Sequence, residues 1–352
     1  MTQSPGQETA HAIYANIDKL AQEITALQHP QRADISPKYG LTTERFGDYA
    51  RHDLHQLAEA IAADNPSQFN KYIIWQRSML RGHQVPDFFW GLNLETEQTA
   101  LFKVLPPESH QAVRSFIAGA RSALNETDRF DISYLEGSKI TSLAKEYLKV
   151  LLAGDRAAAG ELITRAVRDG IGIKDIYLQV FNPCLYEVGR LWQTGKITVA
   201  DEHFFSAATQ LIMSELYPQI NRSSGKNGNI AIAACVSGEL HEIGLRMVAD
   251  LLELGGWRTF YLGSNMPILS IVDMIKGIKA QLLVLSMCLP INGPALREFI
   301  ATTRTRLGTA VKIMIGGYVL SANPAYAASF GADGTAADAG EAVTLANSLV
   351  RG

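Results

Sequence analysis

The sequence contains little cysteine, no strong excess of charge of either sign and no long uncharged apolar run. Its three cysteines, Cys184, Cys235 and Cys288, lie far apart in apolar segments without metal-ligand spacing, which argues against a disulfide scaffold and suits a reducing cytoplasm. No apolar run approaches the ~20 residues that span a bilayer, and the amino-terminal residues lack the basic and apolar regions of a signal peptide. The net charge of −3 gives no reason to expect a nucleic-acid partner. We therefore expect a soluble, cytoplasmic protein.

The chain of 352 residues is too long for one ordinary hydrophobic core, so two or three domains are expected. The clearest boundary is the polar segment "NRSSGKNGN" at 221–229. Residues ahead of it show helical periodicity, and residues after it alternate between strand and helix patterns. We predict an all-α domain over 1–130, a four-helix bundle over 131–220 and an α/β domain over 227–352.

The α/β domain is predicted from five short apolar segments that alternate with amphipathic helices. The predicted strands are 229–236, 257–262, 281–288, 311–315 and, more weakly, 333–336, and the predicted helices are 242–254, 268–279, 293–306 and 340–350. This alternation is typical of a doubly wound, flavodoxin- or Rossmann-like parallel sheet. Such sheets bind ligands outside the carboxyl ends of their strands, which is where we expect the functional site.

The loop after the first predicted strand contains Glu239 and His241, and Gly244 follows in the first helical turn. A neutral imidazole can bind a transition metal, and a nearby carboxylate can orient it. Taken alone, the string is equally typical of a histidine near a helix start that is hydrogen-bonded to a glutamate. Ser286, at the end of the third strand, and Gly316–Gly317, at the end of the fourth, are expected at the same crevice. Together these residues predict a ligand site with His241 as its metal ligand.

The combination Glu239-x-His241-x-x-Gly244, Ser286 and Gly316–Gly317 resembles the cobalamin (vitamin B12)-binding motif, usually written D-x-H-x-x-G, S-x-L and G-G. The resemblance implies that His241 is the lower axial ligand of cobalt and that the nucleotide tail enters a slot lined by the serine and the glycines. Two positions depart from the motif: Glu239 replaces the usual aspartate, and Cys288 replaces the leucine. The preceding four-helix bundle also resembles the usual partner of a cobalamin-binding sheet.

The bundle contains Trp192, followed after nine residues by Glu202–His203. Thr198 and Asp201 predict a capping-box-like start for the last bundle helix, which would place this pair in its first turn. The pattern resembles the adenosylcobalamin-dependent photoreceptors related to MerR-type repressors, which implies that Trp192 packs over the adenosyl group and that Glu202 and His203 line the same pocket. Gln193 departs from the histidine of those repressors, so the resemblance leaves water and His203 as candidate upper ligands after illumination.

The first 130 residues contain "FNKYIIWQRSMLRGHQVP" at 69–86, a pattern similar to that of globin-like sensor domains. The whole arrangement resembles the photocobilins, which implies biliverdin as a second ligand. In the helical segment 42–63, Phe46, Tyr49, Leu54, Leu57 and Ile61 are expected on one broad face. Residue types that suit a bilin are also those of an aromatic helical core with a solvated rim, so both interpretations stay open. They are Tyr49, Arg51, His55, Tyr72, Trp75, Arg77, Arg81, His83, Phe88, Phe89 and Trp90.

The resemblance predicts a light sensor rather than an enzyme. Photolysis of the cobalt–carbon bond of adenosylcobalamin would change the packing of bundle against sheet, and with it the oligomeric state. The expected partners are further copies of the chain and a fused or separate effector. The main alternative is a corrinoid protein that carries methyl groups for a cobalamin-dependent methyltransferase system, and a second alternative is a cobalamin-binding regulator that is insensitive to light.

Overall fold

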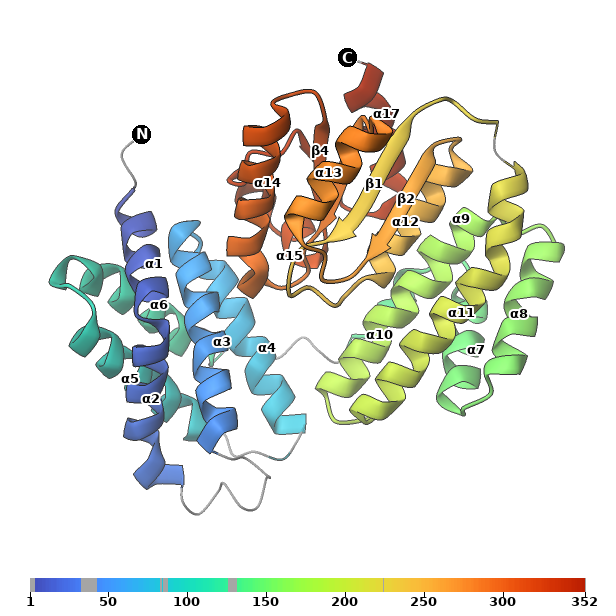
Figure 1. Cartoon of the computed structure of the whole chain (residues 1–352). Helices are drawn as coiled ribbons and strands as arrows, with labels where there is room; N and C mark the ends of the chain where they lie inside the picture. Colours follow the sequence, from blue (N-terminus) through green and yellow to red (C-terminus); the bar gives the residue numbers. More distant parts are fainter. Residues whose placement is uncertain are drawn as a thin grey trace. The chain divides into compact units, whose positions relative to one another are not determined.

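The computed structural model describes residues 4–32, 43–82, 84, 88–125, 132–223 and 225–351. The chain divides into two compact units. The first consists of Met1–Ile132 with Gln193–Lys196, and the second of Ser133–Trp192 with Ile197–Gly352. Figure 1 shows the helices of the first unit in blue to teal and the second unit in green to red. The domain limits expected from the sequence remain predictions.

The first unit is helical throughout its described residues. Its helices are α1 (Pro5–Ala15), α2 (Ile17–Arg32), α3 (Thr43–Ala62), α4 (Pro66–Gly82), α5 (Phe88–Val104), the 3-10 turn η1 (Pro107–Ser109) and α6 (His110–Ala123). They enclose a core to which most of them contribute, with Ile13, Leu57, Phe69, Leu101 and Ile117 among its buried side chains. The all-α prediction for this segment is confirmed, whereas a globin-like fold is not.

One residue of the predicted broad face of α3 does not lie in the core. Phe46, Leu54, Leu57 and Ile61 are buried, but Tyr49 is 43% exposed. The neighbouring Ala50 is buried instead, and Tyr49 is offset from it by one residue's turn of about 100°. Tyr49 therefore lies at the exposed margin of the predicted face.

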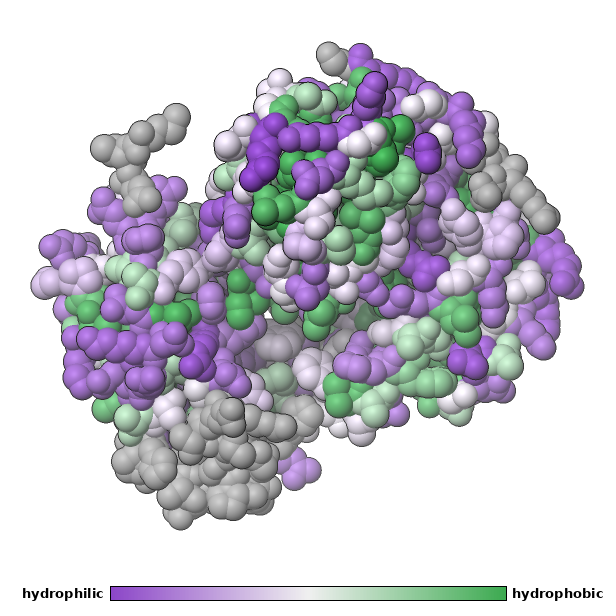
Figure 2. Space-filling view, viewed as in Figure 1, coloured by the Kyte–Doolittle hydropathy of each residue, from purple (hydrophilic) through white to green (hydrophobic). Residues whose placement is uncertain are grey.

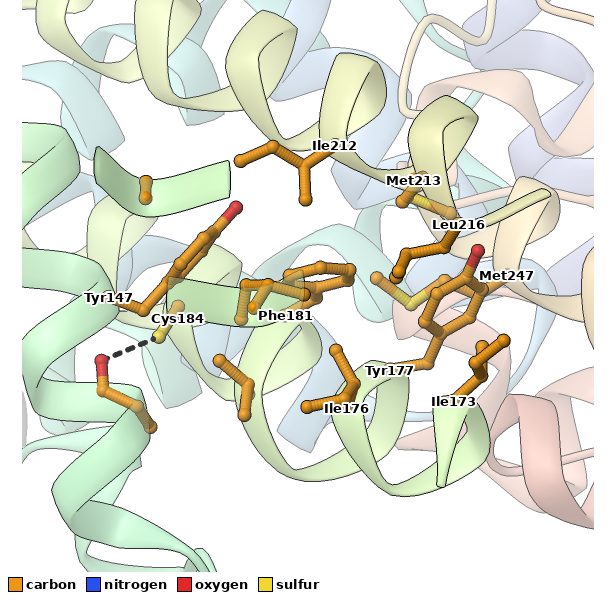
Figure 3. Close-up of a cluster of buried hydrophobic side chains, with 14 of the residues drawn as sticks. Tyr147, Ile173, Ile176, Tyr177, Phe181, Cys184, Ile212, Met213, Leu216 and Met247 are labelled. Atoms are coloured by element: carbon orange, nitrogen blue, oxygen red, sulfur yellow. Dashed lines mark hydrogen bonds between the residues drawn. The ribbon is translucent and has the colours of Figure 1, made fainter. Parts of the chain in front are cut away.

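The second unit begins with a helical bundle. Its elements are η2 (Tyr134–Gly137), α7 (Thr141–Leu152), α8 (Arg156–Arg168), α9 (Ile173–Ile176), a π-helical turn (Tyr177–Phe181), α10 (Asn182–Gln193) and α11 (Val199–Ser223). Because α9, the π turn and α10 follow one another without a break, they act as one long helix, and the predicted four-helix bundle is confirmed. Figure 3 shows its core, in which Tyr147, Tyr177 and Phe181 pack against Ile212 and Leu216 of α11.

The sheet of the second unit contains five parallel strands in the order β2-β1-β3-β4-β5. The strands are β1 (Ile230–Cys235), β2 (Arg258–Gly263), β3 (Leu282–Ser286), β4 (Lys312–Gly316) and β5 (Gly334–Thr335). This confirms the doubly wound prediction. The predicted end of the third strand was two residues too late, since β3 stops at Ser286 and Cys288 belongs to the loop that follows; the other strand ends differ from the prediction by one residue.

Helices cover both faces of the sheet (Figure 1). They are α12 (Ile243–Leu254), α13 (Ile268–Ile278), α14 (Gly293–Leu307), the short α15 (Tyr318–Ser321) and α16 (Pro324–Ala328), and α17 (Ala339–Arg351). α12 packs against α17, and α13 packs against α14. The two short helices after β4 were absent from the sequence prediction, since each is too brief to show helical periodicity.

The bundle and the sheet share apolar and polar contacts. Met247 and Leu251 of α12 belong to the buried core of the bundle. The Tyr177 hydroxyl donates a 2.7 Å hydrogen bond to Asp250 of the same helix. Burial raises the pKa of Asp250 to about 6, although the bond from Tyr177 and the charge of Arg246 oppose the shift. α12 therefore packs against both the bundle and the sheet.

Among the described residues, no helix combines the length and apolarity that crossing a bilayer requires.

Candidate functional site

The carboxyl ends of three neighbouring strands lie level with one another. In the parallel register, Cys235 of β1 is opposite Ser286 of β3, and Ser286 is opposite Gly316 of β4. The loop that leaves β1 carries Glu239 and His241. Because β1, β3 and β4 are adjacent in the sheet, the predicted residues that follow them are brought to one edge.

Glu239 is completely buried, while the side chain of His241 is 59% exposed. One oxygen of the carboxylate, Oε1, accepts hydrogen bonds from His241 Nδ1 at 2.5 Å and from the His241 backbone N–H at 2.9 Å. The carboxylate therefore fixes both the loop and the proton on Nδ1, and Nε2 is left as the nitrogen that can bind a metal.

The other oxygen of Glu239, Oε2, is held by the loop after β3. It accepts hydrogen bonds from the backbone N–H groups of Cys288 and Leu289, at 2.7 and 3.2 Å, and from Asn292 Nδ2 at 3.0 Å. The glutamate side chain thus reaches the histidine with one oxygen and the neighbouring loop with the other. Sequence reasoning missed Asn292, and the only signal for it was its position shortly after a strand end.

The five hydrogen bonds decide the charge of the pair. Burial alone would raise the pKa of Glu239, but the bonds from His241 and from the Cys288 N–H lower it to about 2. The bond to Glu239 raises the pKa of His241, against the opposing effect of burial. Glu239 is therefore an ionised carboxylate at neutral pH, held in place by donors on both sides.

A cavity of about 120 Å³ lies beside these strand ends and brings together four of the predicted residues: Gly244, Ser286, Gly316 and Gly317. Its walls come from the sheet and, through Leu178, Asn182 and Tyr186, from the bundle. His241 and Glu239 are not among its lining residues. The predicted site therefore consists of a histidine loop and a neighbouring slot.

Of these three glycines, only Gly317 has a backbone conformation that requires glycine. Gly317 has a φ of +115°, and a Cβ atom there would lie 2.2 Å from the carbonyl oxygen of Met287, so no other residue fits. At Gly316 an added Cβ would make an ordinary contact of 3.6 Å, and at Gly244 it would meet nothing within 4 Å. Gly244 therefore leaves open space at the cavity wall.

The predicted bundle residues lie at the turn between α10 and α11. Asp201 accepts hydrogen bonds from the backbone N–H and hydroxyl of Thr198, at 2.8 and 2.7 Å, which confirms the capped helix start. Glu202 is bound by His203 Nδ1 at 2.5 Å and by the Ser206 hydroxyl at 2.8 Å. The imidazole of His203 is largely exposed.

Glu202 lies close enough to His241 for its charge to contribute to the raised pKa of the histidine. Trp192 is partly buried near the end of α10. Within the described part of the chain, no hydrogen bond or ring contact joins Trp192 to Glu202 or His203.

Comparison with known proteins agrees with this geometry. Residues 143–217, in the bundle, match a family described as a B12 binding domain, and residues 229–344, in the sheet, match a second family of the same description. The dimethylamine corrinoid protein 3 of Methanosarcina mazei is 31% identical over 170 residues, which span 47% of this chain and 98% of the relative.

The chain belongs to the B12-binding corrinoid proteins.

Another corrinoid protein, from Desulfitobacterium hafniense, is 25% identical to this one over 215 residues, which span 60% of this chain and 99% of the relative. The solved structure of the Methanosarcina barkeri monomethylamine corrinoid protein aligns with a TM-score of 0.54 and 23% identity, covering 59% of this chain and 98% of that one. This second likeness concerns the fold. Residues ahead of position 143 lie outside both family matches.

These findings support a cobalt corrinoid as the cofactor of this corrinoid protein. They support cobalamin binding but do not support the more specific predictions about the cofactor and the signal. Adenosylcobalamin as the form bound, light sensing, biliverdin and light-dependent assembly find no support in the comparisons. The individual site residues remain predictions.

Proposed function

We propose that the cobalt corrinoid is held at the boundary between the bundle and the sheet, with His241 as the lower ligand of cobalt. The observation that carries this proposal is the pairing of a largely exposed imidazole with a fully buried, five-times hydrogen-bonded carboxylate. In the neutral imidazole such a pair keeps the proton on Nδ1, and Nε2 is then free to bind a metal. When bound, the corrinoid supplies a cobalt atom that can carry an alkyl group on the face opposite this histidine.

The slot beside the histidine loop is proposed to take the nucleotide tail. Gly317 lines this slot, and its close approach to the Met287 carbonyl leaves no room for a side chain at that point of the wall. Ser286 is buried and lines the same cavity. Gly244 adds a wall without a side chain at the start of α12.

The cofactor site is tested by the paramagnetic resonance spectrum of the chain loaded with cobalamin and reduced to the Co(II) state. Growth with ¹⁵N-histidine changes the nitrogen splitting from three lines to two if a histidine is bound to cobalt, because the nucleotide base keeps ¹⁴N. We expect two lines for the wild type and loss of that splitting in His241→Ala. A three-line spectrum in the labelled wild type would show that the base, and not His241, is the ligand.

We further propose that the chain carries methyl groups between partner proteins. The names of its relatives support this role, since they are corrinoid proteins of dimethylamine and monomethylamine. His241 would hold the cobalt from below, and Glu239 would keep the imidazole in the metal-binding tautomer during repeated transfers.

Methyl carriage is tested in an extract of the native cells supplemented with the reduced, cobalamin-loaded chain and ¹⁴C-dimethylamine. We expect label on the cofactor of the re-isolated wild type and none on that of His241→Ala. Label that never reaches the wild-type chain, with ¹⁴C-methylamine and ¹⁴C-trimethylamine as well, would remove the proposal for methylated amines.

Light sensing is the second candidate, and the first turn of α11 favours it. Glu202 is hydrogen-bonded to His203 and Ser206, and its charge helps to raise the pKa of His241; we propose that it contacts an upper group such as adenosyl. Loss of that group would remove a contact of Glu202 and shift the balance between two arrangements of bundle and sheet. Trp192 is proposed to cover the same group.

The measurement for this candidate is size-exclusion chromatography of the adenosylcobalamin-loaded chain, in the dark and after green light. A light sensor changes its elution volume, and Trp192→Ala and Glu202→Gln reduce the change. An identical elution volume in both states contradicts light-dependent assembly, even if the cofactor itself is photolysed, because free adenosylcobalamin is also light-sensitive.

Biliverdin binding by the first unit has one structural observation in its favour. Asp53 is buried, and it accepts hydrogen bonds from the Tyr72 hydroxyl, from Gln76 at 2.8 Å and from Asn93 at 3.2 Å. A polar cluster inside a helical core is costly and marks a candidate ligand site. The side chains of His83, Phe88, Phe89 and Trp90 lie outside the described residues. A long-wavelength absorbance band after addition of biliverdin, absent in Asp53→Ala, is the expected result.

A further inference from the structure

Two tyrosine rings meet across the mouth of the slot. Tyr186 comes from α10 of the bundle, Tyr318 follows directly after Gly317 on the sheet, and both line the cavity. Their ring centroids are 5.8 Å apart, with the ring planes inclined at 51°. Tyr186 is 39% exposed and Tyr318 is 54% exposed, so the pair lies at the solvent end of the cavity.

Each ring is attached to a firmly held backbone. On the sheet side, Gly317 lies against the Met287 carbonyl, and the N–H of Tyr318 hydrogen-bonds to the Cys288 thiol. Tyr318 can therefore turn its ring about χ1 without moving the chain.

On the bundle side, Tyr134 stacks on Tyr186 with centroids 5.4 Å apart. The backbone N–H of Tyr134 donates to Glu187 at 3.0 Å, and Glu187 forms a buried ion pair with Arg190 at 2.6 Å. Tyr186 is thus supported from behind by a second ring, whose own position is fixed by a buried carboxylate.

The cavity behind the rings is too small for its proposed occupant. Its volume is about 120 Å³, whereas pockets that hold small molecules measure roughly 300–1,000 Å³. A corrinoid nucleotide, with base, ribose and phosphate, needs a pocket within that range. The slot must therefore widen to admit it, and the contact between Tyr186 and Tyr318 joins the two walls that have to separate.

We propose that Tyr186 and Tyr318 form a gate that controls entry of the corrinoid's nucleotide tail into the slot, an inference that rests on the cofactor site proposed above. Closed, the two rings cover the cavity from the solvent side. Open, they line the entrance with aromatic faces on which the planar base of the tail can slide and stack. The gate acts on the tail alone, because the corrin ring and the histidine loop lie outside the slot.

The test compares a corrinoid that has a nucleotide tail with one that lacks it. Hydroxocobalamin has the tail and diaquocobinamide does not, and the association rate of each with the full-length chain is followed by stopped-flow absorbance. Tyr318→Ala and Tyr186→Ala should bind hydroxocobalamin roughly two- to tenfold faster than the wild type, the factor that one aromatic contact contributes. Binding of diaquocobinamide should be unchanged.

Two matched variants separate the gate from general effects. Tyr318→Phe keeps the ring contact and should retain the wild-type rate. Tyr49→Ala removes a tyrosine of similar exposure from the first unit and should also have no effect. Rates within twofold of wild type in both gate variants would overturn the proposal, as would equal acceleration for the two corrinoids. A wild type that binds neither corrinoid would instead refute the proposed cofactor site.

Discussion

Replacing Glu239 with glutamine tests whether the carboxylate determines the tautomer of His241. The substitution preserves the shape of the side chain but converts one oxygen into a donor. In the wild type all five groups that contact the carboxylate are donors, two from His241 and three from Cys288, Leu289 and Asn292. The amide therefore cannot satisfy both sides.

The less costly orientation of the glutamine directs its oxygen toward the three loop donors. Its NH₂ group then faces the backbone N–H and Nδ1 of His241. The imidazole can accept a bond only by moving its proton to Nε2, and the backbone N–H loses its acceptor. An unsatisfied buried donor costs about 1–3 kcal/mol, and a neutral acceptor forms bonds about half as strong as a charged one. Together these effects predict that Glu239→Gln lowers the free energy of unfolding by about 2–4 kcal/mol.

The assay follows urea unfolding of the cofactor-free chain by tryptophan fluorescence, for which Trp257, buried and bonded to Asn347, reports on the sheet. The cobalamin-loaded variant is then compared with the wild type by the ¹⁵N-histidine spectrum, where protonation of Nε2 should abolish histidine coordination. Wild-type stability together with an unchanged two-line splitting would falsify the role assigned to Glu239.

Three further predictions concern the second unit. The pKa of Asp250 is raised to about 6, so its contribution to stability is complete below pH ~4 and is lost as the pH rises through 6. Asp250→Asn should therefore remove up to about 3 kcal/mol of the difference in unfolding free energy between pH 4 and pH 8. Equal pH dependence in the wild type and the variant would contradict this. Asp333 shows the opposite sign, because its bonds from Arg304 and from the Ile313 N–H, both 2.6 Å, outweigh burial and lower its pKa. Asp333→Asn should cost about 1–2 kcal/mol at pH 7, and this cost should shrink as the pH falls below ~4 and the wild-type carboxylate becomes protonated, measured by urea unfolding over this range. Gly317→Ala should destabilise the chain by at least ~2 kcal/mol because of the positive φ at this position and the clash with Met287. Gly244→Ala places its methyl group in open space and should change stability by less than ~0.5 kcal/mol. Similar melting temperatures for the two variants would contradict this difference.

Much of the sheet could be predicted because its signals are local. Apolar strands such as Ile230–Cys235 and Leu282–Ser286 alternate with amphipathic helices, and parallel topology then places their ends at one edge. The capped start of α11 was equally visible in Thr198 and Asp201. His241 and Glu239 could be paired from sequence because only one residue separates them.

The remaining features depend on contacts between distant segments. Asn292 meets Glu239 only because the loop after β3 folds over the loop after β1. Tyr186 and Tyr318 are 132 positions apart, and nothing in either local sequence indicates that their rings touch. Tyr49 shows the limit of periodicity itself, since a tyrosine at the margin of a buried stripe can turn outward and keep its hydroxyl in water.

Exposed apolar groups on α11 are likewise invisible to a motif search. Phe204 and Leu211 are each about two-fifths exposed, and Figure 2 shows hydrophobic residues among hydrophilic ones over the region of α10 and α11. Helical periodicity locates the buried side of such a helix but does not say how much of the other side stays uncovered.

The position of α12 determines how the second unit can move. This helix begins two residues after His241, and its Met247 and Leu251 are buried in the bundle core. Pulling the bundle away as a rigid cap would expose both side chains, at a cost of about 1.5–3 kcal/mol each. α12 therefore ties the bundle to the sheet, and its first residue lies only two positions from His241. A displacement of the bundle would act through this helix on the loop that carries the metal-binding nitrogen.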